Sequence, residues 1–270
     1  MPELPEVETL RRALAQGLEG HTLKALTIYE PRLLQNTSEQ ELQRAIIGHR
    51  LRVVRRRAKF LLFDFGKHTV ILHLRMTGWP TLIPVKEPRF VFEFTGNKTL
   101  YFSDTRRLAT MHLVPSARVT KLPPLAELGI EPFQPDYTFE NFYALLQTDQ
   151  EIKRLLLDQR KIAGVGNIYA CEALFASKIH PQRPANSLSR AEARRLFTEI
   201  EKILAQAIAE QGTSVRTYRI FTGEPGNFQN FLRVYDRAGA PCFSCKTPIV
   251  RIEQGGRGTY FCPKCQEKTK

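Results

Sequence analysis

The sequence predicts an α+β protein with an antiparallel β sandwich or barrel, a helical region and a metal-binding hairpin. Short segments rich in Val, Leu and Phe follow one another from Leu51 to Phe102, separated by turn residues, which is typical of antiparallel strands. From Phe139 onward, apolar residues recur at helical spacing over longer stretches. Two Cys-x2-Cys pairs near the C-terminus predict a tetrahedral metal site.

The composition limits the class of partner. The chain has 270 residues, which suits about two domains, and a net charge of +13, which favours a polyanionic partner. Nucleic acid is the first candidate and an acidic membrane surface the second. No apolar run approaches the roughly 20 residues of a membrane-spanning helix, and Glu3, Glu6 and Glu8 occupy the place of a signal peptide's apolar core. We therefore expect a cytoplasmic protein without a membrane partner.

The N-terminus carries a candidate nucleophile. Removal of Met1 would leave a secondary amine at Pro2, and an α-amino group ordinarily has a pKa of about 7.7–8.0. An unprotonated amine can attack an electrophilic carbon and form a covalent iminium, and the carboxyl of Glu3 could transfer protons for that reaction. Pro5 fits the first turn of a helix that continues at helical spacing to Leu18. A helix start without catalysis fits this stretch equally well.

Local signals mark the elements that follow. The segment 22–30 reads as a strand, and Ser38 with Glu41 forms the capping box of a helix that Gly48 ends. The segment 115–137 contains five prolines, which exclude a continuous helix or a central strand. We interpret this segment as an interdomain linker, with a surface loop as the alternative.

The helical region is expected to contain, besides a helix through Tyr169 and Phe175, three further helices before the cysteines. Apolar residues mark one helix in 139–146 and another in 152–156. Ser189 with Glu192 forms the capping box of a long third helix, which Gly212 ends.

Four of the five cysteines predict a structural zinc site. Sixteen residues separate the two Cys-x2-Cys pairs, and four thiolates at this spacing form a closed tetrahedral site without an open position for catalysis. The glycine-rich segment 255–258 belongs at the tip of a hairpin, where it offers Arg257 to a phosphate. Cys171, outside the pairs, is expected to be a small buried apolar residue. The predicted ligands of one structural zinc ion are Cys242, Cys245, Cys262 and Cys265.

Two further segments are candidates for phosphate binding. The segment 50–59 has six basic residues in ten and no acid, so it could follow a phosphate backbone or form a charged edge strand that resists aggregation. The segment 164–167 lacks the preceding strand and the third glycine of a dinucleotide-binding motif. It suits a double turn between two helices, whose amide groups would face a phosphate together with Asn167.

Taken together, these motifs resemble a known family. The start Pro2-Glu3-Leu4-Pro5-Glu6, the strand that ends at Lys59, the Gly164–Asn167 turn and the four-cysteine segment resemble the bacterial formamidopyrimidine-DNA glycosylases in content and order. These enzymes excise oxidised purines from DNA and cut the strand. The resemblance covers essentially the whole chain and implies a monomer that binds damaged double-stranded DNA in a cleft between its halves.

The resemblance also implies a domain order. It comprises a catalytic β-sandwich domain flanked by helices (1–114), the linker (115–137), a helix–two-turn–helix domain with a lesion-recognition loop (138–230) and a zinc-finger hairpin (231–270).

The resemblance assigns roles to individual residues. Pro2 would attack C1′ of the damaged nucleotide and form a Schiff base, with Glu3 as the acid and base beside the sugar. Lys59 and Arg257 match the family's residues that act in the β- and δ-elimination steps and that bind phosphates. Lys153 and Asn167 match its phosphate-binding positions, and Arg89 and Arg107 are further expected DNA contacts. The loop that reads 8-oxoguanine corresponds to Val215, Arg216, Thr217 and Tyr218.

The residues expected to fill the space of an everted base depart from the family in one place. Met76 and Arg106 occupy two wedge positions, whereas Leu108 stands where the family usually has Phe. Leucine can fill space but cannot stack as an aromatic ring does. An endonuclease VIII-like glycosylase for oxidised pyrimidines is therefore one alternative, and a non-catalytic damaged-DNA-binding protein is another.

Overall fold

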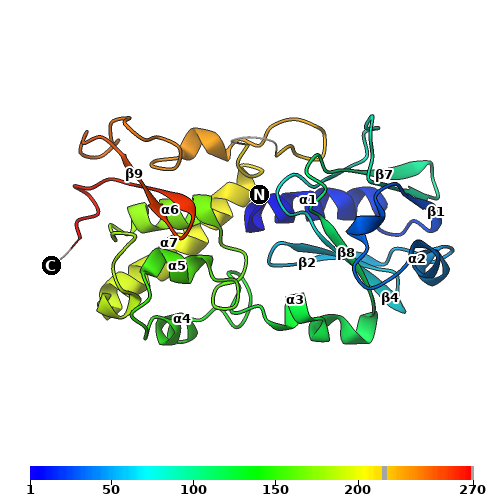
Figure 1. Cartoon of the computed structure of the whole chain (residues 1–270), viewed down its shortest axis with the longest axis horizontal. Coiled ribbons are helices and arrows are strands. Elements are labelled where there is room, and N and C mark those ends of the chain that lie inside the picture. Colours follow the sequence, from blue (N-terminus) through cyan, green and yellow to red (C-terminus); the bar gives the residue numbers. More distant parts are fainter. Residues whose placement is uncertain (215–217, 269–270) are drawn as a thin grey trace. The chain divides into compact units, whose positions relative to one another are not determined.

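The computed structural model describes residues 1–214 and 218–268 (Figure 1). The Cα positions divide into two compact units, each built from two stretches of chain. Unit 1 contains Met1–Ala126 and Ile208–Gln229, and unit 2 contains Glu127–Ala207 and Asn230–Lys270.

Unit 1 is a sandwich of two four-stranded antiparallel sheets. One sheet has the strand order β1-β6-β7-β5, and the other has the order β2-β3-β4-β8. The sandwich predicted from the sequence is confirmed, including the first strand in 22–30. The strands are β1 (Leu23–Ile28), β2 (Val53–Arg57), β3 (Phe60–Asp64), β4 (His68–His73), β5 (Trp79–Thr81), β6 (Phe90–Phe94), β7 (Lys98–Ser103) and β8 (Thr110–Pro115).

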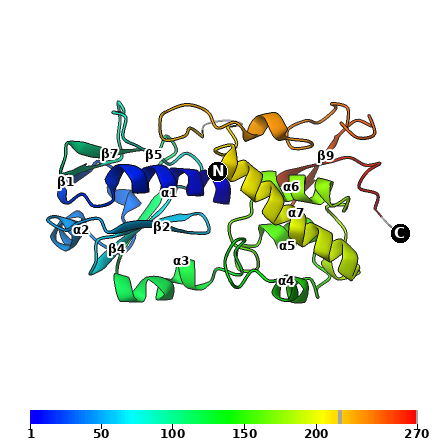
Figure 2. The same cartoon turned by 180° about the vertical axis from the view of Figure 1, so that it is seen from behind.

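The helix α1 (Leu4–Leu18) completes the core of unit 1. Its apolar residues at helical spacing are fully buried and belong to one cluster with residues of both sheets. In the view from behind, α1 runs alongside the strands (Figure 2). The second helix, α2 (Glu39–Ile46), starts at the predicted capping box, in which the Glu41 amide donates to Ser38 Oγ at 3.2 Å.

The proline-rich segment 115–137 contains only short helical elements. They are the 3-10 helix η2 (Ser116–Lys121) and the four-residue α3 (Pro123–Ala126). A further 3-10 helix, η1 (Pro31–Leu33), follows β1. Among the described residues, no helix has the length and apolar character needed to cross a bilayer.

Unit 2 combines helices with a two-stranded hairpin. The helix α6 (Asn167–Ala176) packs against α5 (Ile152–Leu157) and against β10 (Arg257–Phe261), which pairs with β9 (Val250–Gln254). The remaining elements are α4 (Phe139–Leu145), α7 (Arg190–Ala209), which continues into unit 1, and the 3-10 helices η3 (Ala185–Ser187) and η4 (Phe228–Phe231).

The start of α7 confirms the second predicted capping box. The Ser189 amide donates to Glu192 at 2.8 Å, and Arg183 donates to the same carboxylate at 2.5 Å. The hydrogen bond from Arg183 lowers the pKa of Glu192 to about 2. The carboxylate therefore stays charged and fixes both the helix start and the preceding loop.

His73 ends β4 as a buried neutral imidazole. Its Nδ1 accepts the Arg75 amide at 3.0 Å, and its ring meets the Phe60 ring edge to face at 4.5 Å. Burial, followed by the positive charges of Arg75 and Lys59, lowers the pKa of His73 to about 3. The folded state therefore resists taking up a proton that the unfolded chain accepts below pH 6.5.

The free energy of unfolding should fall as pH falls from 6.5 towards 3, with His73 contributing up to about 1.4 kcal/mol per pH unit. Asparagine keeps an acceptor for the Arg75 amide but does not titrate. The His73→Asn variant should therefore lose stability less steeply over this range, as measured by urea denaturation at several pH values. Parallel curves for variant and wild type would contradict the assignment.

Candidate active site

The N-terminus is held inside unit 1. Pro2 is buried and Glu3 is 3% exposed, because the first turns of α1 are embedded in the core. The Glu3 amide donates to Glu6 Oε2 at 2.8 Å, and Pro5 occupies the first helical turn as the sequence predicts. The chain end that carries the candidate nucleophile thus has a fixed position relative to α1.

The same Glu6 carboxylate binds the start of the predicted reading loop. Its Oε1 accepts the Thr213 amide at 2.8 Å. Gly212 precedes this contact at φ +84°, and a Cβ there would lie 3.0 Å from Glu6 Oε1. Glycine is therefore required both by the backbone angle and by the close approach of Glu6.

The predicted reading loop is described only in part. Val215, Arg216 and Thr217 lie outside the described residues. The Tyr218 hydroxyl donates to the Gln211 carbonyl at 3.2 Å, and burial raises the pKa of Tyr218 well above its usual value. Tyr218 therefore packs against the unit 1 core as a neutral phenol.

The predicted basic strand is β2, one of the two edge strands of its sheet. Arg56 is 7% exposed and turns inward, where Nε donates to Glu8 Oε2 at 3.1 Å and Nη1 donates to the Ala58 carbonyl at 2.9 Å. Ala58 adopts φ +48°, and the next residue, Lys59, is 4% exposed. The Glu8–Arg56 pair thus supports the turn that carries Lys59.

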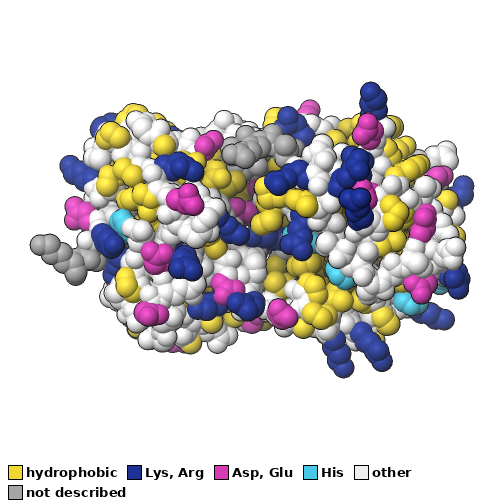
Figure 3. Space-filling view, in the orientation of Figure 1, with side chains coloured by type: hydrophobic (Ala, Val, Ile, Leu, Met, Phe, Trp, Pro, Cys, Tyr) yellow, Lys and Arg dark blue, Asp and Glu magenta, His cyan; other side chains and the backbone are white. Residues whose placement is uncertain are grey.

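Glu8 stays ionised although it is largely buried. Burial opposes ionisation, but hydrogen bonds from Arg11 and Arg12 and the charge of Arg56 lower the pKa of Glu8. Part of the chain's positive charge therefore pairs with Glu8 inside the protein. Figure 3 shows further Lys and Arg side chains on the visible face of each unit.

The predicted wedge residues protrude from two turns of unit 1. Met76 is 37% exposed and Leu108 is 44% exposed, and Arg106 is exposed beside Leu108. Arg107 approaches Glu30 at 3.5 Å. Arg89, predicted as a DNA contact, has a largely buried side chain whose Nε donates to the Asp104 carbonyl at 3.0 Å, so it braces one of these turns.

In unit 2, the predicted phosphate-binding residues contact each other and the hairpin. Lys153 is fully buried, and its Nζ donates to Asn167 Oδ1 and to Thr259 Oγ1, each at 2.7 Å. Asn167 Nδ2 donates in turn to the Gly258 carbonyl at 2.9 Å. The structure therefore brings Lys153 and Asn167 together with β10.

Arg257 is exposed at the start of β10, as the sequence predicts. Gly255 and Gly256 form the hairpin tip with φ +58° and +71°, a geometry suited to glycine. Arg257 lines a pocket of about 240 Å³ with Arg154 and polar side chains of the α5 region. The lining also includes the Asp158 carboxylate, so two guanidinium groups against one carboxylate leave a net positive charge, which favours an anion.

The side chain of Gln159 spans the double turn between α5 and α6. Gln159 donates through Nε2 to the Val165 carbonyl at 2.8 Å and accepts the Gly164 amide at 3.0 Å. Gly164 adopts φ +92°, which favours glycine. The predicted helix after this turn is α6.

The four predicted metal ligands converge. Their sulfur atoms all lie within 4.8 Å of one another, with Cys242 and Cys265 at 3.9 Å and Cys245 and Cys262 at 3.4 Å. A Zn–S bond of about 2.3 Å in a tetrahedral site places sulfurs about 3.8 Å apart. The residues therefore fit one structural zinc ion. Cys171 is buried in the apolar cluster behind them, as expected.

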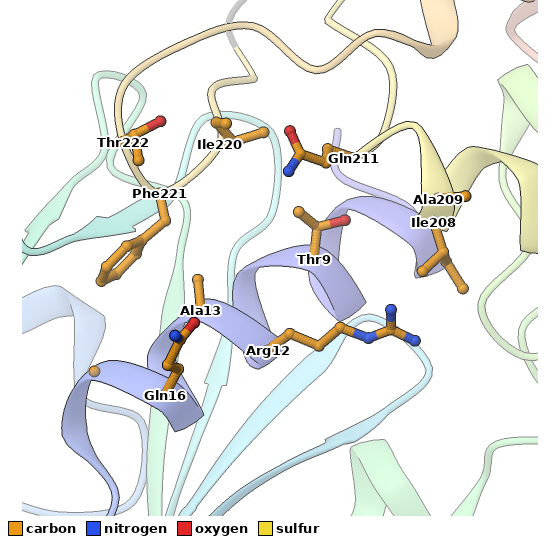
Figure 4. A pocket seen from close by; sticks show the side chains of 11 residues that line it. Thr9, Arg12, Ala13, Gln16, Ile208, Ala209, Gln211, Ile220, Phe221 and Thr222 are labelled. Atoms are coloured by element: carbon orange, nitrogen blue, oxygen red, sulfur yellow. The ribbon is translucent and has the colours of Figure 1, made fainter.

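The pocket in Figure 4 has a volume of about 480 Å³ and lies elsewhere in unit 1. It is bounded by the outer face of α1, the end of α7 and the segment 220–222. Its described lining includes none of the predicted catalytic residues. This cavity is therefore not at the predicted catalytic residues, of which Pro2 and Glu3 lie at the buried N-terminus instead.

The sequence reasoning missed the roles of Glu6 and Asp104. Glu6 stands three residues after Glu3, and this capping-box spacing could have indicated its contact with the Glu3 amide. Its contact with Thr213 has no local signal. Asp104 accepts amide protons within its own turn, a pattern common for Asp in loops but not specific to this site.

The fold and the zinc site define a class of DNA-repair enzyme, the zinc-containing helix–two-turn–helix DNA glycosylases. Family models match the formamidopyrimidine-DNA glycosylase N-terminal domain at residues 1–111, its H2TH domain at 128–219, and the zinc finger found in FPG and IleRS at 239–268. The chain belongs to the formamidopyrimidine-DNA glycosylase family.

Individual relatives match over their whole length. The formamidopyrimidine-DNA glycosylase of Cytobacillus firmus is 41% identical over 273 residues, covering 98% of this chain and 100% of the relative. The crystal structure of the MutM (FPG) protein from Thermus thermophilus matches with a TM-score of 0.90 at 41% identity, with full coverage of both chains. The Lactococcus lactis Fpg in complex with abasic-site DNA matches with a TM-score of 0.91 at 35% identity, covering 98% of this chain and 100% of that one.

Metal analysis should separate the zinc ligands from the fifth cysteine. The Cys245→Ser variant removes one thiolate and should lower the zinc content from one ion per chain to nearly none, because a closed site needs all four ligands. Cys171→Ala changes a buried thiol of the same cluster and should keep its zinc. Mass spectrometry of metal content checks both, and equal zinc loss in the two variants would contradict the ligand assignment.

Proposed function

We propose that this protein is a bifunctional DNA glycosylase and apurinic/apyrimidinic lyase that removes oxidised purines during base-excision repair. The observation that carries the proposal is the N-terminus, where Pro2 is buried and Glu3 is tied to Glu6 at the start of α1. An amine used as a nucleophile must be held still beside its target carbon. A chain end embedded in the core meets that requirement.

The proposed chemistry begins at the Pro2 nitrogen. After Met1 is removed, the nitrogen attacks C1′ of the damaged nucleotide, the bond from C1′ to the base breaks, and the base leaves with a proton. The sugar ring opens to an iminium, with Glu3 transferring protons between the enzyme and the sugar. The iminium increases the acidity of the C2′ protons, so loss of such a proton expels the 3′ phosphate. A second elimination expels the 5′ phosphate, and water need not attack phosphorus.

Basic residues have two proposed roles in these steps. Lys59, next to the turn that Arg56 supports, assists the eliminations together with Arg257, whose guanidinium can bind a departing phosphate. Lys153 and Asn167 bind phosphates of the DNA backbone, with Arg107 as a further contact. Arg89 contributes charge near the DNA while it braces the Asp104 turn.

The relatives support the proposed substrate class. Solved structures with about 35% identity to this chain include a Lactococcus lactis Fpg variant with Fapy-dG-containing DNA and MutM with carbocyclic 8-oxo-G-containing DNA. We propose the same substrates, formamidopyrimidines and 8-oxoguanine in double-stranded DNA, for this protein. Val215, Arg216, Thr217 and Tyr218 would contact the everted base. We further propose that the protein acts as a monomer in the cytoplasm.

Borohydride trapping tests the nucleophile. Wild-type protein on a duplex containing 8-oxoguanine should give a covalent adduct, because borohydride reduces the iminium to a stable amine. Glu3→Gln should slow base excision by about 100- to 10,000-fold, the usual range for loss of an acid/base group. The Pro2→Gly, Glu3→Gln double variant should lose the adduct.

Pro5→Ala is the matched control, because it changes another proline of the same helix start without touching the terminal nitrogen. This variant should still form the covalent adduct in the presence of borohydride. Mass mapping should place the link on a chain that begins at Pro2. An undiminished adduct in the double variant, or efficient strand cleavage by protein that retains Met1, would refute the proposed nucleophile.

Salt dependence tests the proposed phosphate contact of Arg257. In a plot of log affinity against log salt concentration, the slope for Arg257→Gln should be shallower than that of the wild type by about 0.9, because one fewer counterion is released on binding. Affinity should fall by a similar factor for different DNA sequences. Lys202→Gln, which changes an exposed cation that pairs with Glu199, should leave the slope unaltered. Equal slopes for Arg257→Gln and wild type would remove Arg257 from the phosphate contacts.

A further inference from the structure

The two turns that carry the wedge residues are neighbouring crossings between the sheets of unit 1. The turn 74–78 leads from β4 in one sheet to β5 in the other, and the turn 104–109 leads from β7 back to β8. His73, before the first turn, pairs with Thr110, after the second turn. Trp79, after the first turn, pairs with Ser103, before the second turn, so the two turns lie side by side at both ends. The topology therefore places Met76 on the turn next to that of Arg106 and Leu108.

A buried carboxylate organises the second turn. Asp104 is 1% exposed, and its Oδ2 accepts the amides of Leu108 and Ala109, each at 2.8 Å. Its Oδ1 lies 3.3 Å from the Arg106 amide. A buried carboxylate is stable only where donors surround it, and here the donors belong to the residues that form the wedge.

Thr77 connects this carboxylate to the first turn. Its hydroxyl donates to Asp104 Oδ1 and accepts the Arg106 amide at 3.1 Å. Thr77 follows Met76 directly in the chain. A single hydroxyl therefore links the turn that presents Met76 to the turn that presents Arg106 and Leu108.

Both turns are also fixed from their other sides. The Gly78 amide donates to the Leu74 carbonyl at 2.9 Å, and a Cβ at this position would lie only 2.4 Å from the same oxygen. The Asp104 carbonyl accepts Arg89 Nε at 3.0 Å. The turns are therefore rigid supports, whereas the wedge side chains at their tips are exposed to solvent.

We propose that Asp104 and Thr77 are positioning residues that set the spacing of the wedge side chains and thereby the discrimination of the base opposite the lesion. This inference rests on the proposed function. Everting a nucleotide costs a few kcal/mol, and side chains inserted into the vacated space offset that cost. Insertion is most effective when the side chains are held in place before binding, since no ordering cost then arises.

The role predicts different effects on two substrates. A duplex with 8-oxoguanine needs the wedge, whereas a single strand with an abasic site needs only the Pro2 chemistry. Thr77→Val removes the hydroxyl with little change in volume. It should slow single-turnover excision from the duplex by about tenfold, the factor that corresponds to about 1.4 kcal/mol. Cleavage of the single strand should change by less than about twofold, because the Pro2 chemistry is untouched.

Two further variants complete the test. Thr77→Ser keeps the hydroxyl and should restore the duplex rate. Asp104→Asn replaces one accepting oxygen with a donor, so it should slow duplex excision more than Thr77→Val does. In Thr77→Val and Asp104→Asn, the ratio of rates with cytosine and with adenine opposite the lesion should move towards one. The Thr77→Val, Asp104→Asn double variant should lose less of the duplex excision rate than the two single losses combined, because both changes break the same hydrogen bond.

The outcomes separate this inference from the proposed function. Equal slowing of both substrates by Thr77→Val would mean general damage to the fold and would overturn the positioning role. Equal duplex rates for Thr77→Val and Thr77→Ser would also overturn it, whether or not Asp104→Asn folds. Failure of the wild type to cleave the single-stranded abasic substrate would instead refute the proposed lyase activity.

Discussion

The burial of the first turn of α1 is the constraint on which the proposed chemistry depends. A chain end is ordinarily the part of a protein that frays most readily. Here Pro2 is buried, and the Glu6 carboxylate accepts the Glu3 amide on one oxygen and the Thr213 amide on the other. One side chain therefore fixes the terminus and also the start of the predicted reading loop after α7. Displacement of either segment alters the hydrogen bonding of the other.

The features that the sequence could predict are those encoded over a few residues. The capping boxes at Ser38 and Ser189, the glycine at 164 and the paired cysteines each depend on short-range spacing, and the structure confirms them. The short apolar segments separated by turn residues also predicted the sandwich, since such a succession is typical of antiparallel strands.

The features that escaped prediction depend on distant parts of the chain. Nothing near Asn167 in the sequence indicates that its Nδ2 would donate to the Gly258 carbonyl, 91 residues away. The basic character of β2 gave no indication that Arg56 would turn towards Glu8, 48 residues earlier. Neither pairing follows from composition or spacing, because each arises only when the sheets and helices have packed.

The contact between Lys153 and Thr259 has a consequence for how the protein responds to oxidants. Lys153 donates one of its hydrogen bonds to Thr259 of β10, a strand that leads directly into the four-cysteine site. Peroxide and related species convert accessible thiolates, which here are the half-buried Cys245 and Cys265, to sulfenic acids or disulfides, which no longer hold metal. Such damage would release β10 and leave a buried ammonium group short of an acceptor, while the amine at the opposite end of the sequence remained chemically intact. The proposed phosphate contacts of unit 2 would thus be lost before the proposed nucleophile at Pro2 was affected.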